Sequence, residues 1–158
     1  MSASLYEQDF YAWTSEQAAL LRAGNLSAAD IEHIAEEIAD MGGNTLDALE
    51  SNLSRVIEHL LKWRFSPADM PRRGWRRSIL EHRQRIHRAV ARSGSLRRKM
   101  PDLLPEAYAD ARKLAAIGLE DDGLDATVLP TPCPWSLEQI LDEQFWPESD
   151  EPEKTRPR

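Results

Sequence analysis

The ten prolines of this 158-residue chain are distributed very unevenly. None precedes Pro67, whereas six lie between Pro130 and Pro157. Proline inside a helix removes a backbone hydrogen bond and clashes with the preceding turn. The first two-thirds of the chain can therefore hold long helices, and most of the last part cannot.

The residue composition favours helices over strands. The β-branched residues Ile, Val and Thr account for 16 positions, whereas Ala, Leu, Glu and Arg, which have high helix propensity, account for 69. A chain of this length is expected to form one domain. We therefore predict a single all-α domain over residues 1–147. Its fold is an irregular bundle of about five main helices with a proline-rich C-terminal strap and a short final helix.

Caps and apolar periodicity predict three helices in the first 61 residues. A capping-box pattern beginning at Ser4 opens the first helix, which ends at Gly24. The second begins at Ser27 and is ended or kinked by Gly42–Gly43. Apolar residues recur at helical spacing over residues 46–61 and predict the third helix.

The next two helices are bounded by glycine and proline. After a loop at residues 63–74, an apolar stripe predicts a fourth helix that ends at Ser93–Gly94. Pro101 or Pro105 suits the first turn of a fifth helix, which ends at Gly118.

The last part of the chain predicts a strap and a tail. Residues 119–135 show no period and are expected to be extended. A short helix follows Ser136 and ends near residues 145–147, and the charged residues 148–158 are expected to be disordered.

Charge is segregated along the chain, although the net charge is only −7. Residues 1–61 carry −9, residues 62–100 carry +11 and residues 101–158 carry −9. Two interpretations are open. Either the acidic helices pack beside the basic segment and neutralise it, or the basic segment is exposed and binds phosphate or an acidic partner.

Arginine dominates the basic segment, and its planar guanidinium suits both phosphates and carboxylates. Arg83 lies next to the apolar stripe, so we expect it to point inward and pair with Glu36 or Glu37. No helix-turn-helix, zinc-finger or RNA-recognition pattern accompanies the segment, and the pI is near 5.1. Nucleic-acid binding through residues 72–99 is therefore the secondary interpretation. The candidate basic-patch residues are Arg72, Arg73, Arg76, Arg77, Arg85, Arg88 and Arg92.

Histidines and carboxylates provide a metal-binding alternative. Helical spacing places one histidine and three carboxylates on one polar face of the second helix, and two further histidines lie on later helices. The chain has neither a Glu-x-x-His pair nor H-E-x-x-H. If these residues bind no metal, the carboxylates form a solvated acidic face, and the histidine of the core is bound by a carboxylate or a carbonyl. The candidate ligands are His33, Glu36, Glu37, Asp40, His59 and His82.

Several protein classes are not expected. No apolar run approaches a membrane span, and the first residues do not resemble a signal peptide, so we expect a cytoplasmic protein that does not enter a membrane. The single cysteine, Cys133, cannot form an internal disulfide and is expected to pack against the bundle. There is no G-x-S-x-G motif and no phosphate-binding loop, so no catalytic residue and no cofactor-binding residue is predicted.

Six sequence blocks follow one another in a family-specific order: LYEQDFYAWTSEQAALLRAG, IEHIAEEIADMG, HLLKW, WRRSILEHR, AYADAR and CPWSLEQILDEQFWP. Together they resemble the DUF29 family over about residues 5–147. The resemblance implies a compact all-helical bacterial domain and leaves the activity open.

The leading functional interpretation is a non-enzymatic interaction or regulatory module that binds another protein or a second copy of itself. It depends on the missing catalytic motifs and on the segregated charge, which can drive complementary association. The alternatives are nucleic-acid binding and a metal-binding bundle protein or hydrolase.

Overall fold

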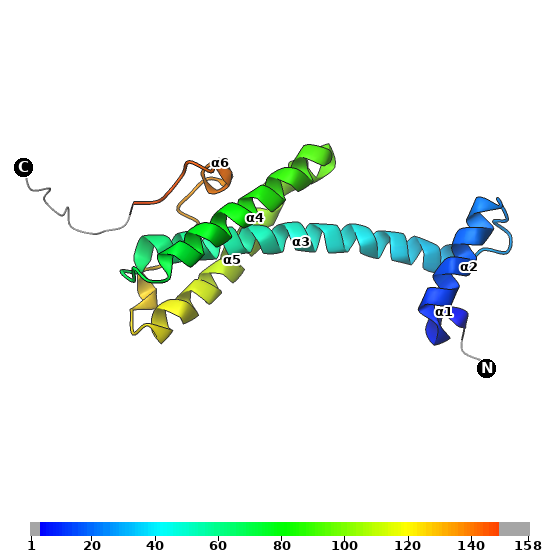
Figure 1. Ribbon diagram of the computed structural model, residues 1–158, viewed down its shortest axis with the longest axis horizontal. Helices are drawn as coiled ribbons and strands as arrows, with labels where there is room; N and C mark the ends of the chain where they lie inside the picture. The colour runs from blue at the N-terminus through cyan, green and yellow to red at the C-terminus, as the bar shows by residue number, and fades with distance from the viewer. Residues whose placement is uncertain (1–3, 149–158) are drawn as a thin grey trace, which may run out of the picture. The chain divides into compact units, whose positions relative to one another are not determined.

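The computed structural model describes residues 4–148, and within this range it is all-helical, without strands (Figure 1). The all-α prediction is confirmed. The predicted disordered tail falls almost entirely outside the described residues. The elements are α1 (Leu5–Gln8), α2 (Phe10–Arg22), α3 (Ile31–Phe65), α4 (Arg72–Arg92), α5 (Gly94–Asp121), the 3₁₀ turn η1 (Ala126–Val128) and α6 (Leu137–Leu141).

The chain divides into two compact units at the Thr45–Leu46 boundary, which lies inside α3. The first unit contains α1, α2 and the beginning of α3. The second contains the rest of α3 and all later elements. Each unit is described separately below.

The first unit begins with two helices where one was predicted. The capping box at Ser4 and Glu7 is present, but α1 ends after one turn. The carboxylate of Asp9 accepts a hydrogen bond from the backbone N–H of Ala12 and caps α2. A side chain that caps a new helix competes with continuation of the previous one, so the predicted helix is interrupted at Asp9.

The predicted helix boundary at Gly42–Gly43 is wrong, because α3 continues through both glycines. Neither glycine has a positive φ, so the backbone there is ordinary helix. The start also differs from the prediction, since the carbonyl of Asp30, and not that of Ser27, accepts the first helical N–H, from Ile34. A glycine costs a helix only about 1 kcal/mol relative to alanine, which continuous backbone pairing can offset.

The start of α5 also differs from the prediction. Ser93 caps the helix through the N–H of Leu96, so α5 begins before both Pro101 and Pro105, which lie inside it. Met100, in the early part of the helix, is 2% exposed and packs in the core. Tertiary packing of the first turns therefore outweighs the cost of the internal prolines.

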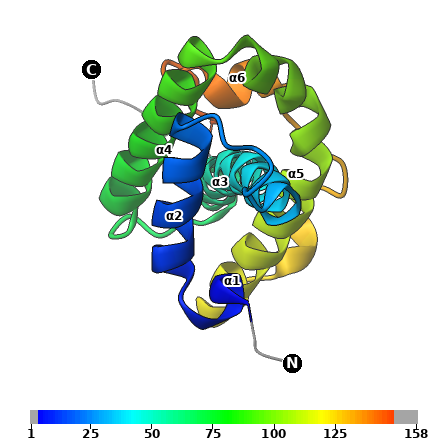
Figure 2. The ribbon, with the colours of Figure 1, turned by 90° about the vertical axis from the view of Figure 1, so that its right-hand side faces the viewer.

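The second unit holds the hydrophobic core. Figure 2 views α3 nearly end-on, with α4 and α5 on either side of it. The largest buried side chains come from α3, α4, α5 and α6, and many are fully buried: Leu53, Val56, Ile57, Leu60, Leu61, Ile79, Ile86, Ala107, Ala111, Ala115 and Ile140. The predicted stripe over residues 46–61 is the centre of this core.

The C-terminal strap, residues 124–147, closes the core of the second unit. Leu129 and Ile140 are buried, and Trp135 and Trp146 pack against the core cluster. The predicted capping box of α6 is present at Ser136, although the helix ends at Leu141, before the predicted residues 145–147. Cys133 packs against the core as predicted, and burial raises the pKa of its thiol.

Candidate functional site

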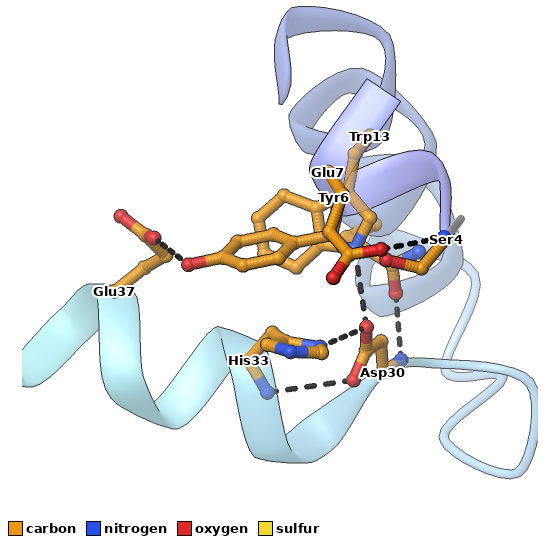
Figure 3. Close-up of polar contacts among 8 residues, drawn as sticks. Ser4, Tyr6, Glu7, Trp13, Asp30, His33 and Glu37 are labelled. Carbon is orange, nitrogen blue, oxygen red and sulfur yellow. Dashed lines mark hydrogen bonds and ion pairs between the residues drawn. The ribbon is translucent and has the colours of Figure 1, made fainter. Parts of the chain in front are cut away.

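The first unit contains a group of interacting polar and aromatic side chains that we call the N-terminal cluster (Figure 3). Asp30 lies at its centre. One carboxylate oxygen contacts Nδ1 of His33 at 2.6 Å and accepts a hydrogen bond from Nε1 of Trp13 at 3.3 Å. The backbone N–H of Asp30 donates to Gln17 at 2.7 Å. The cluster consists of Tyr6, Trp13, Gln17, Asp30, His33 and Glu37.

Tyr6 connects α1 to the beginning of α3. Its ring stacks on His33 with 4.1 Å between the ring centroids, and its hydroxyl donates to Glu37 at 2.5 Å. The hydrogen bond to Glu37 raises the pKa of Tyr6 to about 12. The hydrogen bond to Asp30 raises the pKa of His33 and lowers the pKa of Asp30. The cluster therefore favours a protonated His33 paired with an ionised Asp30.

This pairing changes the role expected for two metal-ligand candidates. Nδ1 of His33 is bound to Asp30, and Glu37 accepts a hydrogen bond from the hydroxyl of Tyr6. Glu36 and Asp40 are exposed on the same part of α3. In the first unit the structure thus brings two of the four candidates, His33 and Glu37, into one hydrogen-bonded cluster with an aromatic ring.

The other two histidine candidates lie in the second unit. Nδ1 of His82 is 2.7 Å from the side-chain carbonyl oxygen of Asn52, so the partner of this histidine is a carbonyl, one of the two kinds of partner expected. Burial lowers the pKa of His59 to about 4, and its Nδ1 is buried with no hydrogen-bond partner among residues 4–148. No group of three or more His, Cys, Asp or Glu side chains in the described chain is arranged to hold a metal ion. The metal hypothesis therefore stays a prediction.

The basic-patch candidates are nearly all exposed. We call the exposed set on α4 the arginine face: Arg73, Arg76, Arg77, Arg85, Arg88 and Arg92. Four of them, at positions 73, 77, 88 and 92, lie within an arc of about 100° at the 100° per residue of a helix. Arg85 pairs with Glu81 at 2.5 Å. Among the described residues, no carboxylate lies within ion-pair distance of the other five arginines.

Arg72 is separate from this face. Its guanidinium lies over the ring of Trp63 at 5.1 Å and donates to the carbonyl of Ser66 at 3.2 Å. Its side chain is only 19% exposed. Of the seven arginines predicted for the patch, six are thus exposed, although Arg85 pairs with Glu81 and Arg76 lies over the ring of Trp146, and Arg72 stabilises the loop before α4.

Arg83 points inward as predicted, but the predicted pairing with Glu36 or Glu37 is wrong. Its side chain is fully buried, and it donates to the carbonyls of Ile140 at 2.7 Å and Phe145 at 3.0 Å. The guanidinium also lies 5.4 Å from the centroid of the Trp146 ring. Because the strap is irregular, some of its backbone carbonyls need hydrogen-bond donors from elsewhere in the chain. Arg83 donates to two of these carbonyls.

Two residues of α5 hold the other part of the strap in the same way. The hydroxyl of Tyr108 donates to the carbonyl of Pro130 at 2.5 Å, and Arg112 donates to the carbonyls of Pro130 and Leu129 at 2.9 and 3.2 Å. Burial raises the pKa of Tyr108. These side chains have a structural role, which the sequence did not reveal because their partners lie at least 17 residues away.

An acidic groove in the second unit was also missed from the sequence. It has a volume of about 420 Å³ between α3 and α5 and is lined by Asp47, Glu50, Ser51, Ser54, Asp110, Lys113 and Leu114. Burial and the neighbouring carboxylates Glu106, Asp110 and Asp47 raise the pKa of Glu50. Asp47 and Glu50 share a face of α3, and Glu106 and Asp110 share a face of α5. The sequence signal is visible on each helix, but only the fold shows that the two faces meet.

No helix in the described part of the chain is long and apolar enough to cross a membrane.

Comparison with known proteins gives one match. The model of the family described as "Domain of unknown function DUF29" matches residues 5–146. No curated protein and no solved structure matches the chain significantly. Since the family match covers nearly the whole sequence and the fold is all-helical, the resemblance seen in the six sequence blocks is confirmed, and the chain belongs to the DUF29 family.

Proposed function

We propose that this protein is a non-enzymatic interaction module that binds an acidic protein surface through the arginine face of α4. The observation that supports the proposal most directly is the imbalance of charge on this helix. Within α4, eight arginines stand against one glutamate, and six of the arginines are exposed. Guanidinium groups pair with carboxylates in a two-pronged geometry, so an acidic partner gains oriented hydrogen bonds in addition to charge neutralisation.

The dimensions of the arginine face favour a compact partner. From Arg73 to Arg92 the face extends about 29 Å at 1.5 Å per residue, which is the length of about five helical turns. The segments before and after the basic one, residues 1–61 and 101–158, each carry a net charge of −9. Because the chain outside residues 62–100 is strongly acidic, repulsion disfavours a long polyanion. A protein partner with a short acidic surface avoids this repulsion, and for this reason we rank it above nucleic acid.

The proposal is tested by reversing charges on the arginine face. The variant Arg73→Glu, Arg77→Glu, Arg88→Glu changes three exposed side chains that make no ion pair within residues 4–148. A matched control, Arg97→Glu, Arg98→Glu, Lys99→Glu, makes the same change in net charge at exposed positions of α5. Circular dichroism checks that both variants keep the helical content of the wild type.

Binding is measured by fluorescence anisotropy with a labelled peptide rich in Asp and Glu and with labelled double-stranded DNA and single-stranded RNA. We expect the peptide to bind the wild type and the control, and to bind the α4 variant at least tenfold more weakly. Binding should weaken as salt rises, because exposed charges are screened. Tighter binding of DNA or RNA than of the peptide, abolished by the same variant, would replace the proposal with nucleic-acid binding. Equal peptide binding by the α4 variant and the wild type would refute it.

A further inference from the structure

The acidic groove between α3 and α5 holds negative charge that its own lining does not balance. Three carboxylates line it, those of Asp47, Glu50 and Asp110, against one basic side chain, Lys113. Nζ of Lys113 is 3.9 Å from Oδ1 of Asp110, and both side chains are more than half exposed, so this pair contributes little. Asp47 and Glu50 form no ion pair within residues 4–148. The groove is therefore rich in charged acceptors that have no basic partner.

Glu50 is the carboxylate most affected by this imbalance. It is only partly exposed, whereas Asp47 and Asp110 are exposed at the rim. Its pKa is raised first by burial and then by the neighbouring carboxylates Glu106, Asp110 and Asp47. A cation bound in the groove would oppose all of these effects and stabilise the ionised form of Glu50.

Ser54 provides an independent sign that the groove receives a ligand. This residue is 9% exposed and lines the groove. Its hydroxyl forms no hydrogen bond to any other residue in the range 4–148. A hydroxyl as buried as this one is normally hydrogen-bonded. Since Ser54 faces the groove, a polar group inside the groove can supply that hydrogen bond.

The lining also determines what kind of ligand fits. Carboxylates only accept hydrogen bonds, so the ligand has to be positively charged and carry donors. No group of three or more His, Cys, Asp or Glu side chains in residues 4–148 is arranged around a single metal ion. From Asp47 to Ser54 the groove follows α3 for about 10 Å, at 1.5 Å per residue. A chain with several ammonium groups can therefore reach carboxylates that one small cation cannot reach together.

We propose that the acidic groove binds a linear aliphatic polyamine, whose ammonium groups pair with Asp47, Glu50 and Asp110. The methylene chain lies on Leu114, which is 45% exposed at the groove, and the hydroxyl of Ser54 accepts a hydrogen bond from an ammonium group. The volume of about 420 Å³ is that of a small-molecule site and favours a free polyamine over the lysines of a peptide. No residue of α4 lines the groove, so this inference goes beyond the proposed function and does not depend on it.

The test is isothermal titration calorimetry of the full-length chain with spermidine at about 20 mM salt, where screening is weak. We expect saturable binding to one site. The groove variant neutralises the three carboxylates and should bind at least tenfold more weakly. A control makes the same change in net charge at exposed residues at the end of α5 and should bind within about twofold of the wild type. The groove variant is Asp47→Asn, Glu50→Gln, Asp110→Asn, and the control is Glu120→Gln, Asp121→Asn, Asp122→Asn.

Two further measurements separate binding from folding. Ser54→Ala removes the hydroxyl and keeps a good helix former, so it should weaken spermidine binding about threefold or more. Glu50→Gln removes a charge that other carboxylates repel, so its melting temperature should be no lower than that of the wild type, while its spermidine binding weakens. Unchanged binding by both single variants would overturn the proposal.

The remaining outcomes decide the ligand class. Absence of saturable spermidine binding up to about 1 mM, or equal weakening by the groove variant and the control, would overturn the proposal. Tighter binding of tetralysine, Mg²⁺ or Ca²⁺ than of spermidine, weakened by the groove variant, would replace the polyamine with a basic peptide or a metal ion. Binding of the acidic peptide through the arginine face should be the same in the groove variant and the wild type, so the two proposals can fail separately.

Discussion

Among the arginines of α4, Arg83 has no exposed surface, and its hydrogen bonds go to the backbone of the strap. Burial lowers its pKa to about 10, so the guanidinium remains charged at neutral pH. Arg83→Met keeps much of the apolar stem but removes both donors. The carbonyls of Ile140 and Phe145 would then be buried without these partners, and we expect the free energy of unfolding to fall by about 2–4 kcal/mol.

Urea denaturation measures this loss, and Arg88→Met is the matched control, because Arg88 is an exposed arginine of the same helix. The control should change stability by less than about 0.5 kcal/mol. Equal stability of the Arg83 variant and the control would show that the strap does not depend on these hydrogen bonds.

A second residue-scale prediction concerns acid sensitivity. Burial lowers the pKa of His59 to about 4, whereas an unfolded histidine titrates near 6.5. The unfolded state therefore binds more protons between these values, and stability falls as the pH falls from about 6.5 to about 4. We expect His59 to contribute up to about 3 kcal/mol of this loss.

The variant His59→Gln should flatten the dependence of stability on pH in this window, measured by urea denaturation at several pH values. Gln84→Ala, at an exposed position of α4 without a titratable side chain, serves as the control and should retain the wild-type slope. A His59 variant with the wild-type slope would contradict the prediction.

At the scale of elements, sequence reasoning succeeded where the signal is local. The capping box at Ser136 and the end of α4 at Arg92 depend on neighbouring residues, and both are present. It failed where distant packing decides, as for the prolines inside α5. It also predicted that Arg83 is buried, from its place next to the apolar stripe, but could not identify carbonyls 57 and 62 residues away as its partners. The acidic groove could not be predicted for the same reason, because its carboxylates come from α3 and α5, which are far apart in the sequence.

The two glycines inside α3 lead to an element-scale prediction. A Cβ added at Gly42 or Gly43 would meet no atom within 4 Å, and neither residue has a positive φ. Gly42→Ala and Gly43→Ala should each stabilise the helix by about 0.5–1 kcal/mol, because alanine loses less conformational entropy on folding. Thermal denaturation followed by circular dichroism measures the change.

Gly123→Ala is the opposite control, since Gly123 has a φ of +75° and an alanine there is strained. Its melting temperature should fall. If Gly42→Ala and Gly43→Ala also lowered the melting temperature, the glycines would be needed for a bend in α3, as the sequence first suggested.

At the scale of the whole molecule, burial is concentrated after the Thr45–Leu46 boundary. Local stability increases with the number of buried apolar contacts. The backbone amides of the two units should therefore differ in their protection from hydrogen exchange. In hydrogen-exchange mass spectrometry at 1 µM, amides of residues 31–41 should exchange at least tenfold faster than those of residues 53–61. Similar protection of both segments at this concentration would contradict the prediction.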